Sequence, residues 1–135
     1  MADTFQLEIV TPEKLVVKDE AEEAQIPGKN GYLGILPGHA PLITELAVGE
    51  ITYKKGSVTN HLAVAWGFAE VLPDKLTILA EVAERAEEID VNRAQKARDR
   101  AEQELRSGSA ETDFQAAEDA LQRATTRLHV AEKAR

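Results

Sequence analysis

Residues 76–94 read Leu76-Thr77-Ile78-Leu79-Ala80-Glu81-Val82-Ala83-Glu84-Arg85-Ala86-Glu87-Glu88-Ile89-Asp90-Val91-Asn92-Arg93-Ala94. The first part of this stretch, Leu76–Glu81, is a short apolar run that is typical of a β-strand. From Asp90 onward the apolar spacing is helical, and aspartate is a preferred residue at the N-terminal cap of a helix. The stretch therefore marks a change from β-structure to helix within one chain.

The part of the chain before this change has the pattern of β-structure. Phe5, Leu7 and Ile9 alternate with polar residues, which indicates a half-buried strand. All five prolines and seven of the eight glycines fall in this part, so turns are frequent. We expect an antiparallel β-sandwich or flattened barrel over residues 1–87. Its further strands are expected near residues 15–17, 24–26, 32–36, 50–53, 61–68, 69–72 and 76–81.

The part after the change, residues 88–135, contains no proline and a single glycine, Gly108. Thr112-Asp113-Phe114-Gln115 fits a capping box at the start of a second helix. We therefore predict an antiparallel hairpin of two helices with its turn near residues 107–111, which makes the chain an α+β protein. The expected apolar stripes are Ala94, Ala97, Ala101 and Leu105 on the first helix, and Phe114, Ala117, Leu121, Ala124, Leu128 and Ala131 on the second.

Both stripes are rich in alanine, so the helices can approach closely but bury little apolar surface. We expect such a hairpin to be weakly stable alone and to require further stabilisation by docking on the β-domain, on a partner protein or around a ligand. A hairpin of this kind is suited to more than one state. A hairpin that is permanently docked on the β-structure remains an equal alternative.

Composition excludes several classes of function. The chain of 135 residues has a formal net charge of −8, which argues against a nucleic-acid-binding protein. It has no cysteine, and its three histidines are scattered, so we expect no metal site built by the protein. No stretch approaches the roughly 20 apolar residues of a membrane-spanning helix, and the N-terminus does not resemble a signal peptide. We therefore expect no direct insertion into a membrane.

The charge is distributed unevenly. Residues 1–87 carry a net charge of −7, whereas residues 88–135 carry −1 and more than half of the lysines and arginines. No nucleophile, zinc-protease or phosphate-loop motif occurs, so we expect no catalytic residues. Gly28-Lys29-Asn30-Gly31 is interpreted as a turn because a strand follows it.

The arginines of the hairpin are candidates for a binding site. Arg93 and Arg100 are seven residues apart, and Arg123 and Arg127 are four apart, so each pair shares a helix face. Folding of the hairpin could bring both pairs together, and guanidinium groups suit phosphate oxygens. The alternative, which composition alone favours, is a set of surface salt bridges with Glu102, Glu104, Glu118 and Asp119. Asp90 is likewise either a helix cap or a polar anchor beside a ligand.

The segment Tyr32–Leu42 is unusually dense in glycine, proline and apolar residues. It is either an internal strand followed by a rigid turn, or an exposed apolar loop that meets another protein.

Two segments, Gly31–Leu42 and Ile89–Ala94, resemble the epsilon subunit of F-type ATP synthases in its bacterial form. The opening Leu7–Glu13 also matches this family. Ala65–Val71 resembles the family's Gly-Gly-Phe strand, with Ala-Trp in place of the first glycine. The resemblance covers essentially the whole chain and implies the same β-sandwich followed by a helical hairpin.

The resemblance implies a non-catalytic subunit in the central stalk of a proton- or sodium-translocating ATP synthase. The β-domain would bind the gamma subunit and rest on the membrane ring of c subunits, with the loop around Tyr32 and His39 approaching the ring. The hairpin would lie folded, or extend towards the alpha and beta subunits and inhibit ATP hydrolysis. The complex would sit at the cytoplasmic face of a bacterial plasma membrane, with this subunit peripheral.

Ile89-Asp90-Val91-Asn92-Arg93-Ala94 is similar to the motif of family members that bind ATP in the folded hairpin. In that case Arg100, Arg123 and Arg127 would face the phosphates. Mg²⁺ would accompany ATP through its phosphates, with few or no protein ligands. The resemblance places the remaining contacts around the adenosine or between it and the phosphates: Glu84, Ile89, Asp90, Arg93 and Ala94.

Two other classes of function remain as alternatives. A free-standing helical hairpin could grip other proteins as a chaperone does, and a small enzyme could hydrolyse nucleotides. Co-purification with the alpha, beta and gamma subunits would exclude the first alternative. Turnover of nucleotide by the isolated chain would be needed for the second.

Overall fold

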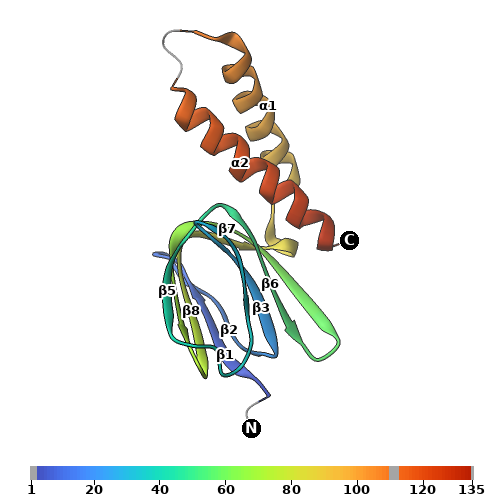
Figure 1. Ribbon diagram of the computed structural model, residues 1–135. Coiled ribbons are helices and arrows are strands. Elements are labelled where there is room, and N and C mark those ends of the chain that lie inside the picture. The colour runs from blue at the N-terminus through green and yellow to red at the C-terminus, as the bar shows by residue number, and fades with distance from the viewer. Residues whose placement is uncertain (1–2, 110–112, 135) are drawn as a thin grey trace. The chain divides into compact units, whose positions relative to one another are not determined.

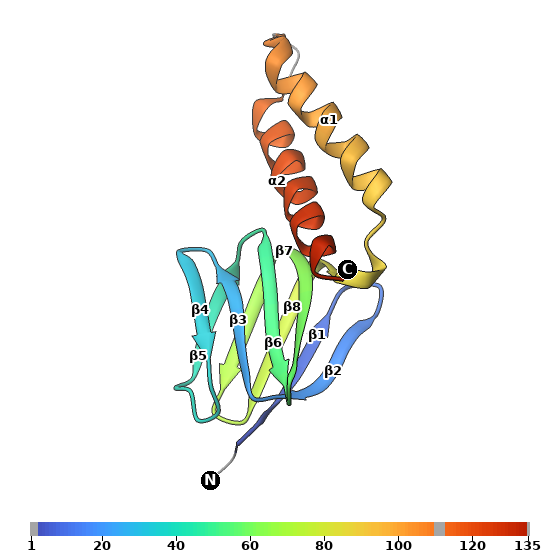
Figure 2. The ribbon, with the colours of Figure 1, turned by 90° about the vertical axis from the view of Figure 1, so that its right-hand side faces the viewer.

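The computed structural model describes residues 3–109 and 113–134. The chain divides into two compact units between Arg85 and Ala86, so the helical unit begins two residues before the boundary predicted at 87/88. Figures 1 and 2 show the strands of the first unit and the two helices of the second.

The first unit contains eight strands within residues 3–85, which form a β-sandwich (Figure 2). Their order along the sheet is β2-β1-β8-β7-β5-β3-β4, and β6 pairs with both β3 and β7. All pairs are antiparallel except β1 with β8, which run parallel. The strands are β1 (Phe5–Val10), β2 (Leu15–Ala21), β3 (Glu23–Gly28), β4 (Gly31–Ile35), β5 (Leu42–Leu46), β6 (Gly49–Lys55), β7 (Val58–Leu72) and β8 (Lys75–Arg85).

The strands differ from the prediction in two places. Residues 61–68 and 69–72 belong to one strand, β7, which pairs with β8 over most of its length. Residues 42–46 form β5, which was not predicted because four of its five residues are exposed or half-buried and show no clear alternation. Both differences have the same cause. The bounds of β5 and β7 are set by pairing with strands that are distant in sequence, and the local residue pattern does not show this pairing.

The long strand β7 passes from one partner to another. Its residues up to Val64 pair with β6, and its residues from Gly67 pair with β5. At the change, Trp66 has φ 53° and Gly67 has φ 120°, both in the left-handed half of conformational space. The two positive φ values bend β7 so that it serves both layers of the sandwich.

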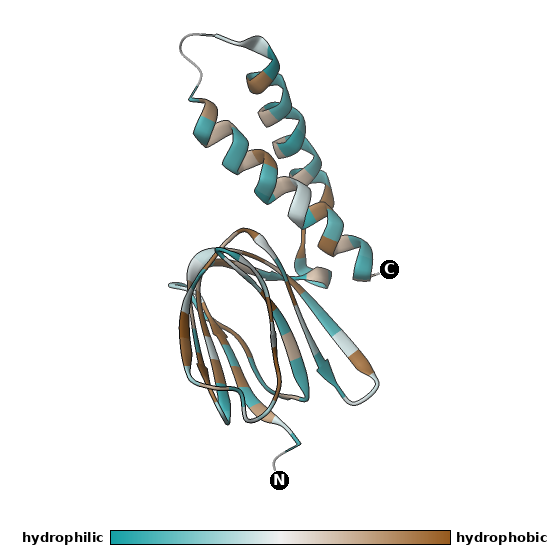
Figure 3. Cartoon of the chain, viewed as in Figure 1, coloured by the Kyte–Doolittle hydropathy of each residue, from teal (hydrophilic) through white to brown (hydrophobic). Residues whose placement is uncertain are grey.

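The core of the first unit is mainly aliphatic, with two buried aromatic residues, Phe5 and Tyr53. Figure 3 shows hydrophobic residues spread along the strands, whereas hydrophilic residues predominate on the helices. The largest fully buried side chains of this unit are Leu7, Ile9, Val17, Ile26, Ile35, Ile51, Tyr53, Leu62, Val71, Leu76 and Ile78.

The second unit contains α1 (Val91–Ser107) and α2 (Phe114–Ala131), with short 3₁₀ turns η1 (Ala86–Glu88) and η2 (Glu132–Ala134). Asp90 caps α1 by accepting a hydrogen bond from the Arg93 N–H at 3.1 Å. Gly108 ends α1 in the left-handed conformation, with φ 60°. The helices run antiparallel (Figure 1), and no described helix is long and apolar enough to cross a bilayer.

The start of α2 differs from the prediction in two ways. Its cap is Asp113, whose Oδ1 accepts from the Ala116 N–H at 3.0 Å, and the predicted cap Thr112 lies outside the described residues. The Gln115 side-chain amide donates to Asp119 Oδ1 at 3.0 Å. Phe114 is 49% exposed and so does not join the apolar stripe. The buried stripe residues form an alanine seam of Ala94, Ala101, Ala117, Ala124 and Ala131, with Leu105, Leu121 and Leu128 half-buried.

Candidate functional site

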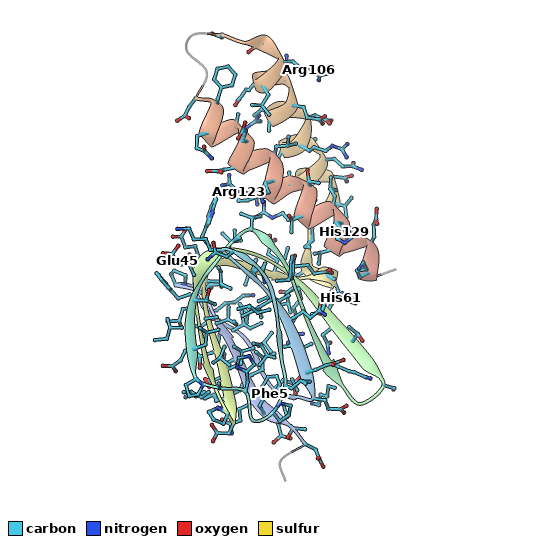
Figure 4. The ribbon with its side chains drawn as sticks, in the orientation of Figure 1. Phe5, Glu45, His61, Arg106, Arg123 and His129 are labelled. Carbon is cyan, nitrogen blue, oxygen red and sulfur yellow. The ribbon has the colours of Figure 1, made fainter. Side chains whose placement is uncertain are left out.

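Each of three arginines of the helical unit comes immediately before a buried alanine of the seam. Arg93 and Arg100 precede Ala94 and Ala101 on α1, and Arg123 precedes Ala124 on α2. Arg93 and Arg100 are exposed, whereas Arg123, labelled on α2 in Figure 4, is half-buried, as is Arg127.

The alanine seam places all four arginines along one edge of the hairpin. An α-helix turns by about 100° per residue, so the residue before each alanine lies about 100° to one side of the seam. Arg127, three residues after Ala124, lies about 60° to that same side. In an antiparallel pair, equal rotations away from the shared seam lead to the same edge. We call this edge, with Arg93, Arg100, Arg123 and Arg127, the arginine edge.

The other residues predicted to contact ATP at the start of α1 are close in sequence to Arg93. Ile89 and Ala94 are buried, with exposed fractions of 8% and 2%. Asp90 is exposed and uses one carboxylate oxygen for the helix cap. The cap predicted for Asp90 is therefore present, and its second oxygen can serve a ligand at the same time.

Glu84 belongs to the other unit. It lies near the end of β8, opposite Ala63 of β7, and is half-buried. The structure thus gathers seven of the eight predicted ATP contacts in the helical unit and leaves Glu84 in the β-sandwich.

Two of the acidic residues predicted to form salt bridges contact side chains other than the four arginines. Glu102 pairs with Arg98 at 3.5 Å, and Asp119 accepts from Gln115 at 3.0 Å. Arg98 lies on the opposite side of the alanine seam from the arginine edge. Among the described residues, no group of histidine, aspartate and glutamate has an arrangement that could hold a metal ion.

Tyr32 lies near the start of β4, whereas His39 lies in the segment that follows this strand. The Tyr32 hydroxyl accepts a hydrogen bond from the Glu50 N–H at 2.9 Å, while its ring remains largely exposed. A Cβ at Gly49 would come within 2.7 Å of this hydroxyl, so glycine makes room for the tyrosine. The surface predicted around Tyr32 and His39 is therefore not a single loop.

The loop that carries His39 is held by backbone hydrogen bonds and by a contact of the histidine ring. The Gly38 N–H donates to the Pro73 carbonyl at 2.7 Å, and the His39 N–H donates to Leu36 at 3.1 Å. His39 Nδ1 lies 2.7 Å from the Ala40 carbonyl. The segment combines features of both alternatives, because the strand β4 is followed by a turn at Pro37 and Gly38, and the neighbouring Leu36 is 58% exposed.

An apolar patch on the outer face of β5, β7 and β8 was not predicted. Phe68 and Leu79 are directly opposite each other, and Ile43 lies diagonally across from Phe68. Their exposed fractions are 53%, 55% and 70%, and they line a depression of about 220 Å³ with Ala69, Glu70 and Thr77. We call Ile43, Phe68 and Leu79 the apolar patch.

A signal for the apolar patch was present in the sequence. Phe68 and Leu79 are out of phase with the buried residues Ala69 and Ile78 of the same strands. A strand with apolar residues on both faces indicates that its outer face is also covered. Without knowledge of the strand pairing, these residues could not be placed together.

The chain matches two known domain families in succession. Residues 4–86 match the family described as ATP synthase, Delta/Epsilon chain, beta-sandwich domain. Residues 87–132 match the family described as ATP synthase, Delta/Epsilon chain, long alpha-helix domain. Together the two matches cover nearly the whole chain.

Proteins with similar sequences are named ATP synthase epsilon chain. The ATP synthase epsilon chain of Koribacter versatilis is 73% identical over 111 residues, which cover 82% of this chain and 78% of the relative. That of Geotalea uraniireducens is 48% identical over 135 residues, or 99% of this chain and 98% of the relative. A chain in the structure of the Euglena gracilis mitochondrial ATP synthase, OSCP/F1/c-ring, has the same fold, with TM-score 0.80, 22% identity, and coverage of 99% of this chain and 82% of that one.

Proposed function

This chain belongs to the ATP synthase delta/epsilon family as an epsilon subunit of the bacterial type, and from this membership we propose a division of labour between its two units. The β-sandwich joins the gamma subunit to the membrane ring of c subunits in the central stalk. The helical hairpin binds ATP when folded, and extends towards the alpha and beta subunits to inhibit ATP hydrolysis when ATP is scarce.

The apolar patch supports the first part of the proposal. Three large apolar side chains that are each more than half exposed form one surface, which is typical of a protein interface. We assign this patch to the gamma subunit. The exposed Tyr32 ring and the loop with Leu36 and His39 are assigned to the ring, as two separate contacts.

The arginine edge is the observation that carries the ATP proposal. Four guanidinium groups along one side of the hairpin suit the oxygens of a triphosphate, to which arginine can donate paired hydrogen bonds. Mg²⁺ would accompany the phosphates with few or no protein ligands. Ile89, Asp90 and Ala94 at the start of α1 would lie near the adenosine.

Regulation of the hairpin by ATP follows from the thermodynamic linkage between ATP binding and the folded state. A ligand that binds only the folded hairpin shifts the population towards that state. A shift from 1:99 to 99:1 requires roughly 5.5 kcal/mol of differential binding. Hydrogen bonds to charged groups contribute about 1.5–3 kcal/mol each, so a few arginine–phosphate bonds suffice in gross terms.

Titration calorimetry of the chain with ATP, with and without Mg²⁺, tests the ATP site. We expect one-to-one binding that is at least about tenfold weaker in Arg100→Ala and in Arg123→Ala, since each loses a charge-assisted hydrogen bond. Arg106→Ala is the matched control, because Arg106 is an exposed arginine at the end of α1 on the other side of the alanine seam (Figure 4). Unchanged affinity in both edge variants would refute the ATP assignment and leave the family membership intact.

A further inference from the structure

The chain has three asparagines, and each is followed by a different kind of residue. The three pairs are Asn30-Gly31, Asn60-His61 and Asn92-Arg93. Asparagine is a thermolabile residue, because the backbone nitrogen of the next residue can attack its side-chain carbonyl carbon and displace the amide. A bulky neighbour hinders this attack and glycine does not. The rate at each position therefore depends on the neighbour and on how firmly the local backbone is held.

Asn30 lies in the two-residue turn between β3 and β4, which ends at the paired residues Gly28 and Gly31. Asn30 and Gly31 are both exposed, and within residues 3–109 and 113–134 no hydrogen bond holds the Asn30 side chain. Gly31 has φ 131°, and a side-chain carbon placed on it would meet no atom within 4 Å. The approach of the Asn30 side chain to the nitrogen of Gly31 is therefore open.

The other two asparagines are held in regular structure. Asn92 lies in the first turn of α1, and the N–H that follows it, that of Arg93, donates to Asp90 Oδ1 at 3.1 Å. Asn60 is half-buried and lies within β7, in the ladder of this strand with β6. At either position the helix cap or the strand pairing must open before the nitrogen can attack.

We propose that Asn30 is a site of spontaneous deamidation and isomerisation in the folded chain. The nitrogen of Gly31 bonds to Cγ of Asn30, and the side-chain amide leaves as ammonia together with the proton of the Gly31 N–H. The product is a cyclic succinimide, which water then opens. Cleavage of the bond between the nitrogen and Cγ gives aspartate. Cleavage of the bond to the backbone carbonyl carbon gives isoaspartate, in which the chain continues through the former side chain.

Isoaspartate adds a carbon atom to the backbone of a tight turn. Gly28 and Gly31 are directly opposite each other, and a side-chain carbon on Gly28 would lie only 2.8 Å from the Gly31 carbonyl oxygen. Lys29 is held as well, since its N–H donates to the Glu45 carbonyl at 2.9 Å and its ammonium pairs with the Glu45 carboxylate at 3.1 Å. The longer backbone therefore displaces the start of β4, next to Tyr32.

The consequence for function rests on the proposed function, in which the exposed Tyr32 side chain contacts the membrane ring of c subunits. The Tyr32 hydroxyl accepts a hydrogen bond from the Glu50 N–H at 2.9 Å, which fixes the direction of the side chain. Displacement of the start of β4 disturbs this hydrogen bond. Isoaspartate at position 30 thereby weakens the contact with the ring as the protein ages.

Mass spectrometry after incubation of the folded chain at mildly alkaline pH tests the site. Each asparagine falls in a separate tryptic peptide, and none of the three peptides contains glutamine. The peptides are residues 30–54, 56–75 and 86–93. A gain of about 1 Da in a peptide therefore reports its single asparagine. A sample digested before incubation corrects for the reaction during digestion, and chromatography separates the aspartate and isoaspartate forms.

We expect Asn30 to react about tenfold faster or more than Asn92, because a hydrogen bond to a carboxylate must break before the Arg93 nitrogen can attack. Asn60 should also remain largely unmodified while Asn30 is converted, and isoaspartate should be among the products. Similar rates at the three positions, or an unmodified Asn30, would overturn the proposal. This measurement does not depend on any binding partner.

Asn30→Gln is the matched variant for the consequence. Glutamine keeps the amide but needs a larger ring to react, and the position has no positive φ, since Trp66 alone among the described non-glycine residues does. Fresh wild type and variant should bind an isolated c ring alike. After incubation the wild type alone should lose binding, in proportion to its isoaspartate content.

Equal binding of the two incubated chains would overturn the link between Asn30 and the ring contact. Absence of binding in both fresh chains would instead refute the contact assigned to Tyr32 under the proposed function. The peptide analysis distinguishes these cases, because it follows the chemistry of Asn30 whether or not the c ring is bound.

Discussion

Gly67 lies so close to Leu79 that the carbonyl oxygen of Leu79 occupies the space of a side chain at residue 67. Gly67 is paired with Ala80 in β8 and has φ 120°, a conformation that L side chains rarely adopt. This is the point at which β7 leaves β6 and joins β5. Glycine at this position therefore permits both the close approach to Leu79 and the bend by which one strand takes part in both layers.

Gly67→Ala is expected to lower the free energy of unfolding by more than about 2 kcal/mol, because it adds backbone strain to a clash with the backbone of β8. Urea denaturation measures the change. Gly34→Ala is the matched control, since a Cβ there has no atom within 4 Å and no positive φ. The control should change stability by less than about 1 kcal/mol. Equal effects of both substitutions would contradict the role of Gly67.

Asp19 is expected to make stability depend on pH. A hydrogen bond from Lys55 is the largest cause that lowers the pKa of Asp19 below its ordinary value of 3.8. A carboxyl group with a lower pKa in the folded chain stabilises it above the unfolded pKa, and this contribution is lost as pH falls through the folded pKa. Asp19→Asn should thus lower the free energy of unfolding by a constant amount above about pH 5, and by progressively less below pH 3.8. Urea denaturation of the wild type and of Asp19→Asn across this pH range measures the difference in the free energy of unfolding. A difference that stays the same at the lowest pH would contradict the role of the Asp19 carboxylate.

Asp90 can be tested for its two roles separately. Serine also caps helices, so Asp90→Ser should leave the free energy of unfolding within about 0.5 kcal/mol of the wild-type value. If the second carboxylate oxygen contacts the ligand, the same variant should still lose ATP affinity in calorimetry. Asp113→Ala is the comparison, because it removes the cap of α2 and should cost about 1 kcal/mol of helix stability. Full ATP affinity in Asp90→Ser would reduce Asp90 to a cap.

The alanine seam is expected to tolerate no larger side chain. Ala124 is 1% exposed, and Ala124→Leu should destabilise the hairpin by about 1–3 kcal/mol through overpacking. Ala116→Leu, at an exposed position of the same helix, is the control and should have little effect. Helix content followed by circular dichroism during heating distinguishes the two. A stable Ala124→Leu hairpin would show that the helices do not pack closely at this position.

The apolar patch is expected to contribute to gamma binding and little to folding. Phe68→Ser should leave the free energy of unfolding nearly unchanged but weaken binding to a gamma-containing complex about tenfold or more, as burial of a phenylalanine implies. Val58→Ser is the control, because Val58 is 57% exposed at the far end of β7. Surface plasmon resonance measures both affinities. Similar losses in the two variants would argue against the patch as the interface.

Much of the candidate site could be predicted because it is local. Arg93 and Arg100, and Arg123 and Arg127, are related by helical spacing within a few turns, and Asp90 caps the helix that carries two of them. That all four arginines lie along one edge depends on the antiparallel packing, which the alanine seam indicates. The apolar patch could not be predicted in this way, because Ile43, Phe68 and Leu79 come from three strands.

The sequence by itself determined the division into β-sandwich and helical hairpin, since strand and helix periods and helix caps depend on neighbouring residues. The tertiary structure decided the parallel pairing of β1 with β8, the single long strand β7 and the meeting of Asp19, Tyr53 and Lys55. These features depend on which distant strands pair and in which register. Local pattern does not contain that information, because the same alternation fits several partners and both directions.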